Sequence, residues 1–218
     1  MAYNIVALDF DGVLVKQESA WWTLHIEFGT YQESKFNLGA YENGEIGYGE
    51  FMKRDISLWG RRTVGEVKDI LLKYDLNPQA KSFIDELKKD GRKVVVVSAG
   101  IDLLVADAAN KLGIKQFVAN GLEADRNGYL TGSGIVRVDL MRKDLALKEL
   151  IEREGGNLSE VAAVGDSKYD LAFLEASGLG IGFGEQSKSK ALDKVADAWT
   201  EKLMEIPQII KNLEQNVK

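Results

Sequence analysis

The first residues that indicate chemistry are two aspartates that directly follow an apolar run near the start of the chain. Asn4–Leu8 is apolar and β-rich, and the segment from Asp9 to Val13 (DFDGV) follows it. Side chains at positions i and i+2 of a strand point the same way, so Asp9 and Asp11 leave the strand end together. Two adjacent carboxylates repel each other unless a cation or a proton offsets their charge. The pair therefore indicates a site for a hard cation such as Mg²⁺, and an acidic turn that only caps backbone groups is the structural alternative.

A second acidic segment and a lysine follow later in the chain. Asp166 and Asp170 come after the apolar run Val161–Val164, which places further carboxylates at a strand end. Lys143 lies near the start of a helical pattern, where a positive charge opposes the helix dipole and gains nothing structurally. That placement favours contact with an anion over a solvated surface lysine.

A serine and a glycine follow the apolar run Lys93–Val97. Ser98 and Gly100 stand just before a helical pattern, so the Ser98 hydroxyl and the first free backbone N–H groups are suited to receive an anion. The structural alternative is that Ser98 is an ordinary helix cap.

These residues need a fold that brings them together, and alternating apolar and helical patterns predict one. A parallel doubly wound sheet follows from such alternation, and ligands bind at the carboxyl ends of its strands. The expected strands are Asn4–Leu8, Lys93–Val97, Gln116–Ala119 and Val161–Val164, and the expected helices are Pro78–Asp90, Ile101–Leu112, Arg142–Glu154 and Tyr169–Ser177.

Three segments fall outside this alternation. Residues 16–74 show amphipathic helical patterns without a comparable strand run, so we expect a helical insertion after the first strand. Leu122–Asp139 contains Asn127-Gly128 between apolar stretches, which predicts a β-hairpin beside the sheet. The tail predicts a short strand near Ala198-Trp199 and a closing helix after Pro207.

The composition excludes several classes of function. The chain has 218 residues, no cysteine and one histidine, which excludes disulfides, thiolate metal sites and cysteine nucleophiles. A formal net charge of -6 without a long Lys/Arg cluster argues against nucleic-acid binding. With no membrane-spanning run or secretory signal, we expect a soluble, cytoplasmic protein that is a monomer or a homodimer.

The four groups of polar residues, in this order and spacing, resemble the haloacid dehalogenase superfamily of phosphotransferases. The helical insertion, the hairpin and the Lys143 to Asp166 spacing are most similar to phosphoserine phosphatases. This resemblance implies an α/β fold with a Rossmann-like catalytic core at residues 1–15 and 76–218, and a small helical-bundle cap at residues 16–75.

The resemblance also implies roles for individual residues. Asp9 would attack phosphorus and form an aspartyl-phosphate, and Asp11 would protonate the leaving oxygen and then activate water. Ser98 and Lys143 would complete the catalytic set by binding the phosphoryl group. Asp9, Asp166 and the backbone carbonyl of Asp11 would hold Mg²⁺, and Asp170 would support that site.

The residues implied for substrate binding both match and depart from the phosphoserine phosphatase pattern. Glu18 stands where that family holds the substrate's amino group, and Ser98 and Gly100 stand where it binds phosphate. Asp55 occupies the position expected for an arginine that binds the substrate carboxylate, and Tyr169 replaces an asparagine. Three nearby arginines are candidates to supply the missing guanidinium: Arg54, Arg61 and Arg62.

Three functions remain open at this point. The first is hydrolysis of a small phosphorylated metabolite, with phosphoserine the leading candidate and a sugar phosphate, phosphoglycolate or another phosphomonoester as alternatives. The second is transfer of the phosphoryl group to an alcohol, and the third is a binding module without catalysis. In the cap, we expect Trp21, Trp22 and Trp59 to form its core, or one of them to line the substrate pocket, and His25 to be structural.

Overall fold

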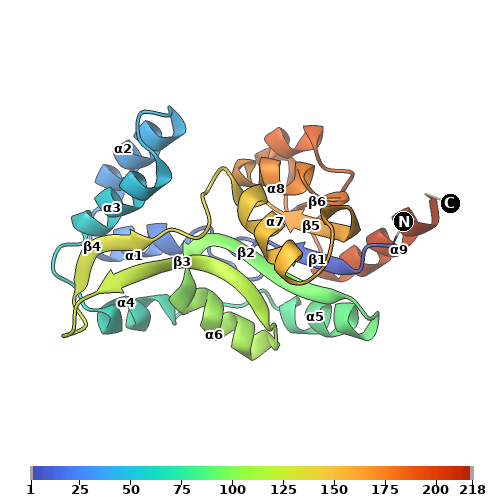
Figure 1. Ribbon diagram of the computed structural model, residues 1–218, viewed down its shortest axis with the longest axis horizontal. Coiled ribbons are helices and arrows are strands. Elements are labelled where there is room, and N and C mark those ends of the chain that lie inside the picture. The colour runs from blue at the N-terminus through green and yellow to red at the C-terminus, as the bar shows by residue number, and fades with distance from the viewer. Residues whose placement is uncertain (1, 217–218) are drawn as a thin grey trace.

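The computed structural model describes residues 2–216, which form a seven-stranded sheet covered by helices (Figure 1). The strand order is β4-β3-β2-β1-β5-β6-β7, and every neighbouring pair runs parallel except the antiparallel hairpin β3-β4. The strands are β1 (Ile5–Leu8), β2 (Lys93–Ile101), β3 (Gln116–Ala124), β4 (Leu130–Ile135), β5 (Val161–Gly165), β6 (Leu179–Phe183) and β7 (Ala198–Thr200). The predicted α/β fold with a hairpin beside a parallel sheet is confirmed.

Helices cover both faces of the sheet and create two hydrophobic cores. The helices outside the cap are α5 (Ala80–Lys89), α6 (Asp102–Leu112), α7 (Lys143–Arg153), α8 (Leu171–Glu175) and α9 (Ile206–Asn216). Val6 and Leu8 of β1 share one core with residues of α5, α6 and α9. Ile5 and Ala7 share the other core with residues of α7 and α8. Burial on both faces explains why this strand is a continuous apolar run.

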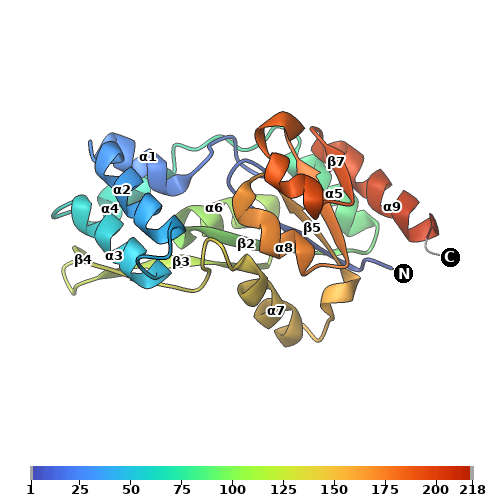
Figure 2. The ribbon, with the colours of Figure 1, turned by 90° about the horizontal axis from the view of Figure 1, so that it is seen from above.

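The segment between β1 and α5 forms a helical cap at one end of the molecule (Figures 1 and 2). Its helices are α1 (Ala20–Glu27), α2 (Tyr31–Glu42), α3 (Tyr48–Leu58) and α4 (Val64–Leu71). The chain enters and leaves the cap through two adjacent segments. The Lys16 N–H donates to the Asp75 carbonyl at 3.0 Å, and the Asn77 N–H donates to the Leu14 carbonyl at 2.9 Å. These contacts lie at the predicted boundaries of the cap, 15/16 and 75/76.

The hairpin β3-β4 runs along the cap, with α2 and α3 above it and α4 below it in Figure 1, and contacts the cap directly. Its turn contains Asn127-Gly128, and the Val64 N–H of the cap donates to the Gly128 carbonyl at 2.9 Å. A Cβ atom at Gly134 would lie only 2.3 Å from Met52 Cε, so α3 packs closely on β4. The cap is therefore attached to the hairpin as well as to its two linkers.

Three strands differ from the sequence prediction. The strand β3 continues past Ala119 to Ala124. The strand β2 continues past Val97 to Ile101, and Ile101, not Ser98, is the N-cap of α6, so the helix-cap interpretation of Ser98 is wrong. The strand β6 was not predicted because its sequence, LGIGF, alternates with glycine. A Cβ atom at Gly182 would lie 2.1 Å from the ring of Trp199, so glycine is required where β7 packs beside β6.

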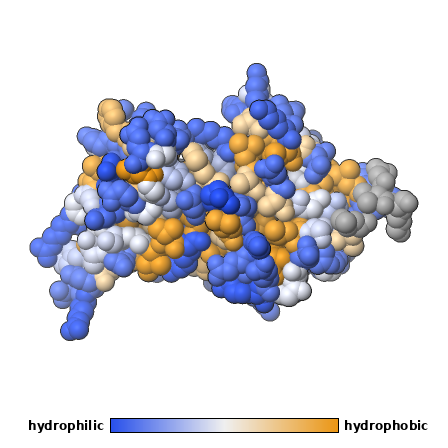
Figure 3. All heavy atoms as spheres, turned by 45° about the horizontal axis from the view of Figure 1, so that its top comes forward, coloured by the Kyte–Doolittle hydropathy of each residue, from blue (hydrophilic) through white to orange (hydrophobic). Residues whose placement is uncertain are grey.

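The surface is mixed in polarity on the face shown in Figure 3, where hydrophobic residues form separate patches among polar ones. The most exposed large hydrophobic side chains in the cap are Phe36, at 79% exposure, and Ile26, at 64%. None of the helices in residues 2–216 has the length and hydropathy required to cross a membrane.

Candidate active site

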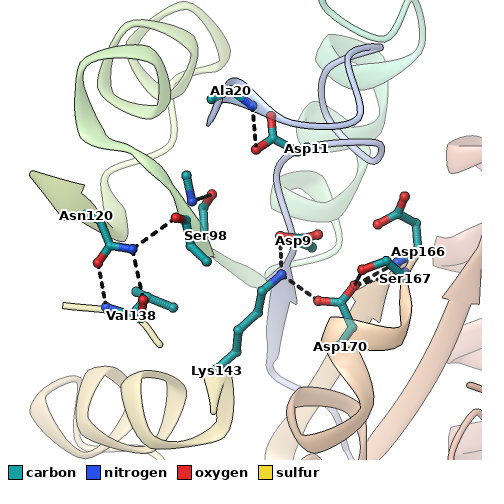
Figure 4. Close-up of polar contacts among 12 residues, drawn as sticks. Asp9, Asp11, Ala20, Ser98, Asn120, Val138, Lys143, Asp166, Ser167 and Asp170 are labelled. Atoms are coloured by element: carbon teal, nitrogen blue, oxygen red, sulfur yellow. Dashed lines mark hydrogen bonds and ion pairs between the residues drawn. The ribbon is translucent and has the colours of Figure 1, made fainter. Parts of the chain in front are cut away.

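The core residues predicted to carry chemistry, except the fully buried Asp170, line one pocket at the carboxyl ends of three adjacent strands (Figure 4). Asp9 and Asp11 follow β1, Ser98 and Gly100 lie at the end of β2, and Asp166 follows β5. Because β1 pairs with both β2 and β5, these strand ends are neighbours. The pocket has a volume of about 380 Å³, and cap residues form its opposite wall.

Lys143 joins two carboxylates at the base of this pocket (Figure 4). It is the first residue of α7, and its Nζ lies 2.8 Å from Asp9 Oδ1 and 2.7 Å from Asp170 Oδ1. All three side chains are at most 7% exposed. Burial opposes the charge on the lysine, but Asp170 and Asp9 together hold the pKa of Lys143 above its ordinary value. The ammonium therefore stays charged and fixes the orientation of the Asp9 carboxylate.

Asp170 is fully supplied with hydrogen-bond donors. Its Oδ1 contacts Lys143, and its Oδ2 accepts the backbone N–H groups of Asp166 and Ser167, each at 3.1 Å. The side chain has no solvent exposure. Asp170 thus holds the loop after β5 in place and links it to the lysine.

The other carboxylates are crowded and poorly solvated. Burial, reinforced by Asp170 and opposed by Lys143, raises the pKa of Asp9 to about 6. Burial and then the charge of Asp9 raise the pKa of Asp11 to about 7, and the same two effects, with Asp170 added, raise the pKa of Asp166 to about 8. Asp11 Oδ1 is buried without a hydrogen-bond partner, whereas its Oδ2 accepts the Ala20 N–H at 3.4 Å. The cluster carries more negative charge than Lys143 balances.

These residues fit a hard divalent cation. Asp9, Asp166 and Asp170 each offer an oxygen, and the three oxygens lie within 4.8 Å of one another. Since Asp170 already bonds to the lysine and two amides, Asp9 and Asp166 are the carboxylates left to bind metal. A Cβ atom at Gly12, which has a φ of 76°, would lie 2.1 Å from Asp166 Oδ2, so glycine lets this carboxylate approach the turn after β1. A set of oxygen ligands of this kind suits Mg²⁺.

On the opposite side of Asp9, Ser98 and Gly100 line the pocket. Ser98 is 1% exposed, and its Oγ accepts the Gly100 N–H at 2.9 Å. Their position at the end of β2, beside the carboxylates, leaves a hydroxyl and a backbone turn facing the space between core and cap.

Asn120, which sequence analysis missed, organises this side of the pocket (Figure 4). It is completely buried, and its Nδ2 donates to the carbonyls of Ala99 at 3.0 Å and Val138 at 2.9 Å. Its Oδ1 accepts the backbone N–H groups of Arg137 and Val138. One amide thus ties the end of β2 to the segment that leads to α7 and Lys143. The available sequence clue was a lone amide directly after the predicted apolar strand Gln116–Ala119.

The cap wall is mainly aromatic. Trp59 is 3% exposed and belongs to a hydrophobic core, as expected, but both Trp21 and Trp22 line the pocket. Trp21 Nε1 donates to the Ala99 carbonyl at 3.0 Å, and the Tyr48 hydroxyl donates to the same carbonyl at 3.2 Å. These two rings are therefore held next to Ser98.

Asp55 also faces the pocket from the cap. It is 2% exposed, and its Oδ1 accepts a hydrogen bond from Asn37 Nδ2 at 2.8 Å. His25 Nε2 lies 3.3 Å from Asp55 Oδ2, and Trp59 Nε1 donates to His25 Nδ1 at 3.2 Å. His25 is thus buried within the cap, between Asp55 and the aromatic core.

Of the other residues predicted to bind substrate, only some reach the pocket. Glu18 lines the pocket and is exposed. Arg54 is not brought to the pocket, because it pairs with Glu50 at 2.8 Å on an exposed part of α3. Arg61 lies over the Tyr129 ring and Arg62 over the Phe28 ring, at 4.1 and 4.6 Å from the ring centroids. Among the described residues that line the pocket there is no arginine.

A further contact between cap and core was not foreseen. Tyr169, which follows β5 in the chain, donates its hydroxyl to Glu42 Oε1 of α2 at 2.5 Å. Lys168 Nζ lies 2.7 Å from the same oxygen. Nearby, the Tyr41 hydroxyl donates to Asp139 Oδ1. These bonds fasten the end of α2 to the segments that carry Asp170 and precede Lys143.

Comparison with known proteins identifies what this geometry resembles. Residues 6–175 match the family model of haloacid dehalogenase-like hydrolases. A probable phosphoserine phosphatase from Schizosaccharomyces pombe is 34% identical over 87% of this chain, and the phosphoserine phosphatase of Methanocaldococcus jannaschii is 30% identical over 95%. The match spans 64% of the first relative's length and 98% of the second's. A third relative, from Archaeoglobus fulgidus, is 31% identical, and 55% of its length is matched.

Solved structures agree with these relatives. A phospho-aspartyl intermediate analogue of phosphoserine phosphatase superposes with a TM-score of 0.80 at 28% identity, covering 96% of this chain and 99% of the other. A substrate-bound phosphoserine phosphatase complex gives a TM-score of 0.80 at 27% identity over the same shares of the two chains.

Proposed function

The chain belongs to the haloacid dehalogenase-like hydrolases and, within them, to the phosphoserine phosphatase family, and from this we propose that it hydrolyses a small phosphomonoester with Asp9 as nucleophile. The observation that supports this most directly is the shared pocket in which Asp9, Asp11, Ser98, Lys143 and Asp166 meet. Phosphoryl transfer depends on alignment and on neutralising the phosphoryl oxygens, and this set of groups supplies both.

In the proposed first step, a carboxylate oxygen of Asp9 attacks phosphorus while the bond from phosphorus to the substrate's alcohol oxygen breaks. Asp11 gives its proton to that leaving oxygen. In the second step, Asp11 removes a proton from water, whose oxygen attacks the aspartyl-phosphate, releasing inorganic phosphate and restoring Asp9. A group that must act both as acid and as base works best with a pKa near neutrality, and the pKa of Asp11 is raised to about 7, chiefly by burial.

The neighbouring residues would position the reacting groups. Lys143 holds Asp9 in place and, together with the Ser98 hydroxyl and the Gly100 turn, would bind the phosphoryl oxygens. Asp9, Asp166 and the Asp11 carbonyl would hold Mg²⁺, while Asp170 positions Lys143. When bound, Mg²⁺ would supply charge neutralisation at the phosphoryl group.

The relatives' names make phosphoserine the leading candidate substrate, and Glu18 is available to bind an amino group. A sugar phosphate, phosphoglycolate or another small phosphomonoester is the alternative, favoured by the presence of Asp55 where an arginine is expected. Transfer to an alcohol is the second alternative. In that case, added serine or homoserine would change the products without changing consumption of the phosphoryl donor.

The proposal extends to the division of the chain. Residues 1–15 and 76–218 would act as the catalytic core in the cytoplasm, and residues 16–75 as a cap that closes over the site, with hinges near Val15-Lys16 and Tyr74-Asp75. Closure would exclude water while the aspartyl-phosphate forms. Solution scattering with and without a phosphate analogue measures this, and identical profiles would argue against a moving cap.

The direct test is phosphate release by the purified protein with Mg²⁺. The panel contains phosphoserine, phosphoglycolate, a sugar phosphate and p-nitrophenyl phosphate, with EDTA and Asp9→Asn as controls. We expect turnover that EDTA abolishes and that Asp9→Asn lowers by at least about 10³-fold. An Asp9→Asn protein as active as wild type would instead support a different reaction or a binding module.

A further inference from the structure

The cap wall of the pocket faces the part of the substrate that is attached to phosphate. The core wall is occupied by the residues proposed for phosphoryl transfer, so the substrate's alcohol part must face the cap. The cap wall presents aromatic and acidic side chains to that part: Trp21, Trp22, Tyr48, Phe51 and Asp55, with Glu18 at the exposed entrance.

The two lysines that line the pocket belong to the core and not to the cap. Among the described residues that line it, the charged nitrogens are those of Lys143 and Lys188. Lys143 contacts Asp9 and Asp170, and Lys188 Nζ lies 3.0 Å from Glu185. A carboxylate on the alcohol part would therefore meet no free guanidinium or ammonium on the cap wall. Recognition of carboxylates in proteins normally uses such a group, most often arginine.

Asp55 adds a negative charge where a substrate carboxylate would need a positive one. Trp59 Nε1 can only donate, so its 3.2 Å contact makes His25 Nδ1 an acceptor, and the Thr30 hydroxyl lies 2.7 Å from the same nitrogen. His25 Nε2 lies 3.3 Å from Asp55 Oδ2 without a hydrogen bond of its own. Asn37 donates to Asp55 from an uncharged amide, and among the described residues no lysine or arginine pairs with this carboxylate. A buried carboxylate of this kind is stabilised by a cationic ligand and repels an anionic one.

The aromatic residues favour the same ligand charge. Trp21 and Tyr48 are oriented by their bonds to the Ala99 carbonyl, and the Phe51 ring lies 5.8 Å from that of Tyr48. The faces of such rings attract ammonium groups, most strongly when the site is shielded from water. Fixed rings next to a buried carboxylate form a surface for an organic cation.

We propose that the substrate is a phosphomonoester of an amino alcohol, with an ammonium group and no carboxylate on its alcohol part. This inference rests on the proposed phosphatase function and specifies its substrate class. It separates the protein from phosphoserine, whose ammonium the cap wall would accept and whose carboxylate it would repel.

A matched pair of substrates tests the inference on the wild-type protein. Phosphoethanolamine is phosphoserine without its carboxylate, so the ratio of their kcat/KM values isolates that group. We expect phosphoethanolamine to be preferred by on the order of a hundredfold, because like charges brought together in a binding site cost several kcal/mol. Equal kcat/KM values, or a preference for phosphoserine, would overturn the inference.

A neutral ester separates this inference from the proposed function. p-Nitrophenyl phosphate carries neither ammonium nor carboxylate, and its Mg²⁺-dependent turnover reports the phosphatase reaction alone. Turnover of this ester combined with a preference for phosphoserine would overturn the substrate class and leave the phosphatase intact. Absence of turnover with every ester would overturn both.

A substitution in the cap locates the effect. Asp55→Asn keeps the size of the side chain and an oxygen for Asn37, and it should lower the ratio of kcat/KM for phosphoethanolamine to that for p-nitrophenyl phosphate by about tenfold. Asp69→Asn, an exposed residue of α4, is the matched control and should change neither. An equal loss with both esters, at an unchanged thermal midpoint, would contradict a role of Asp55 in recognition.

Discussion

The core wall and the cap wall of the pocket differ in how their negative charges are balanced. On the core wall, Asp9 and Asp170 share the ammonium of Lys143, and the remaining charge is suited to a metal ion. On the cap wall, Asp55 accepts a hydrogen bond from the Asn37 amide and lies beside the His25 imidazole, with no lysine or arginine partner among the described residues. The core wall is balanced around a transferred phosphoryl group, whereas the cap wall stays negative toward whatever the phosphate is attached to.

Because of this difference, we expect the core wall to determine the rate of the reaction and the cap wall to determine which substrate is preferred. A change on the core wall alters groups that every ester would use, so it should lower all activities together. A change on the cap wall alters only what surrounds the alcohol part, so it should reorder substrates.

The largest effect is expected from Lys143→Met. Removing the ammonium leaves Asp9 and Asp170 as two buried carboxylates without their shared partner, which we expect to lower kcat/KM by about 10³-fold. The free energy of unfolding should fall by about 3–5 kcal/mol, as measured in urea. Lys148→Met, exposed on the same helix, is the control. Losses in kcat/KM that differ widely among esters would contradict the proposed division of roles between the two walls.

Asn120→Ala tests the residue that connects the walls. Asn120 bonds to the end of β2 and to the segment before α7, and its Nδ2 also lies 3.0 Å from the Tyr48 hydroxyl of the cap. Its loss leaves buried backbone groups without partners, so the free energy of unfolding should decrease by about 2–4 kcal/mol. Asn110→Ala, on the exposed side of α6, should change it by less than about 0.5 kcal/mol. Equal effects of the two substitutions would show that the buried amide is dispensable.

The stability of the metal-free protein should depend on pH. The pKa values of Asp9, Asp11 and Asp166 are raised to about 6, 7 and 8 from an ordinary 3.8, so the folded metal-free protein binds more protons than the unfolded chain between these limits. Its stability should therefore decline as pH rises through this window, lowering the thermal midpoint by roughly a few degrees between pH 5.5 and 8.5. Mg²⁺ should restore the midpoint at the higher pH.

Asp166→Asn supplies the control for this pH dependence, because it removes the carboxylate with the largest rise in pKa. The decline with pH should be shallower in this variant, and the effect of Mg²⁺ smaller. A wild-type midpoint that is independent of pH and of Mg²⁺ would show that the carboxylates are balanced without a cation.

The smallest effect is expected from Tyr169→Phe, which removes only the hydroxyl that contacts Glu42 of the cap. Losing one hydrogen bond that favours the closed cap should raise KM about three- to tenfold for every ester, with little change in kcat. Tyr129→Phe, on the hairpin, is the control. A change in the order of substrates would mean that Tyr169 belongs to the recognition surface.

The core wall could be predicted from the sequence because its residues sit at fixed offsets from apolar runs. Asp9, Asp11 and Asp166 each follow a buried strand, and the parallel sheet places those strand ends together. The helices α5, α6 and α7 begin and end within two residues of the predicted positions, because their hydrophobic periodicity is strong. The segment Tyr169–Ser177 is less regular, since a 3₁₀ turn at Lys168–Asp170 precedes α8.

The cap wall could not be predicted in this way. Asp55 contacts His25 and Asn37, which lie on two other helices. Only tertiary packing therefore reveals that the carboxylate is retained within the cap. Arg54 is adjacent to Asp55 in sequence yet points to an exposed partner, because consecutive helical residues face different directions. Asn120 was missed for a related reason, since its bonds join segments that are 17 to 21 residues away.

The paired linkers also bear on how such a molecule changes over evolution and how it can be engineered. Because Leu14 and Lys16 bond to Asn77 and Asp75, the inserted helices begin and end at almost the same place. A segment whose ends already meet can be lengthened, shortened or exchanged with little loop-closure penalty to the rest of the chain. The cap could therefore be exchanged as a unit. Grafting the cap of a relative between these two residue pairs would require only two adjacent junctions.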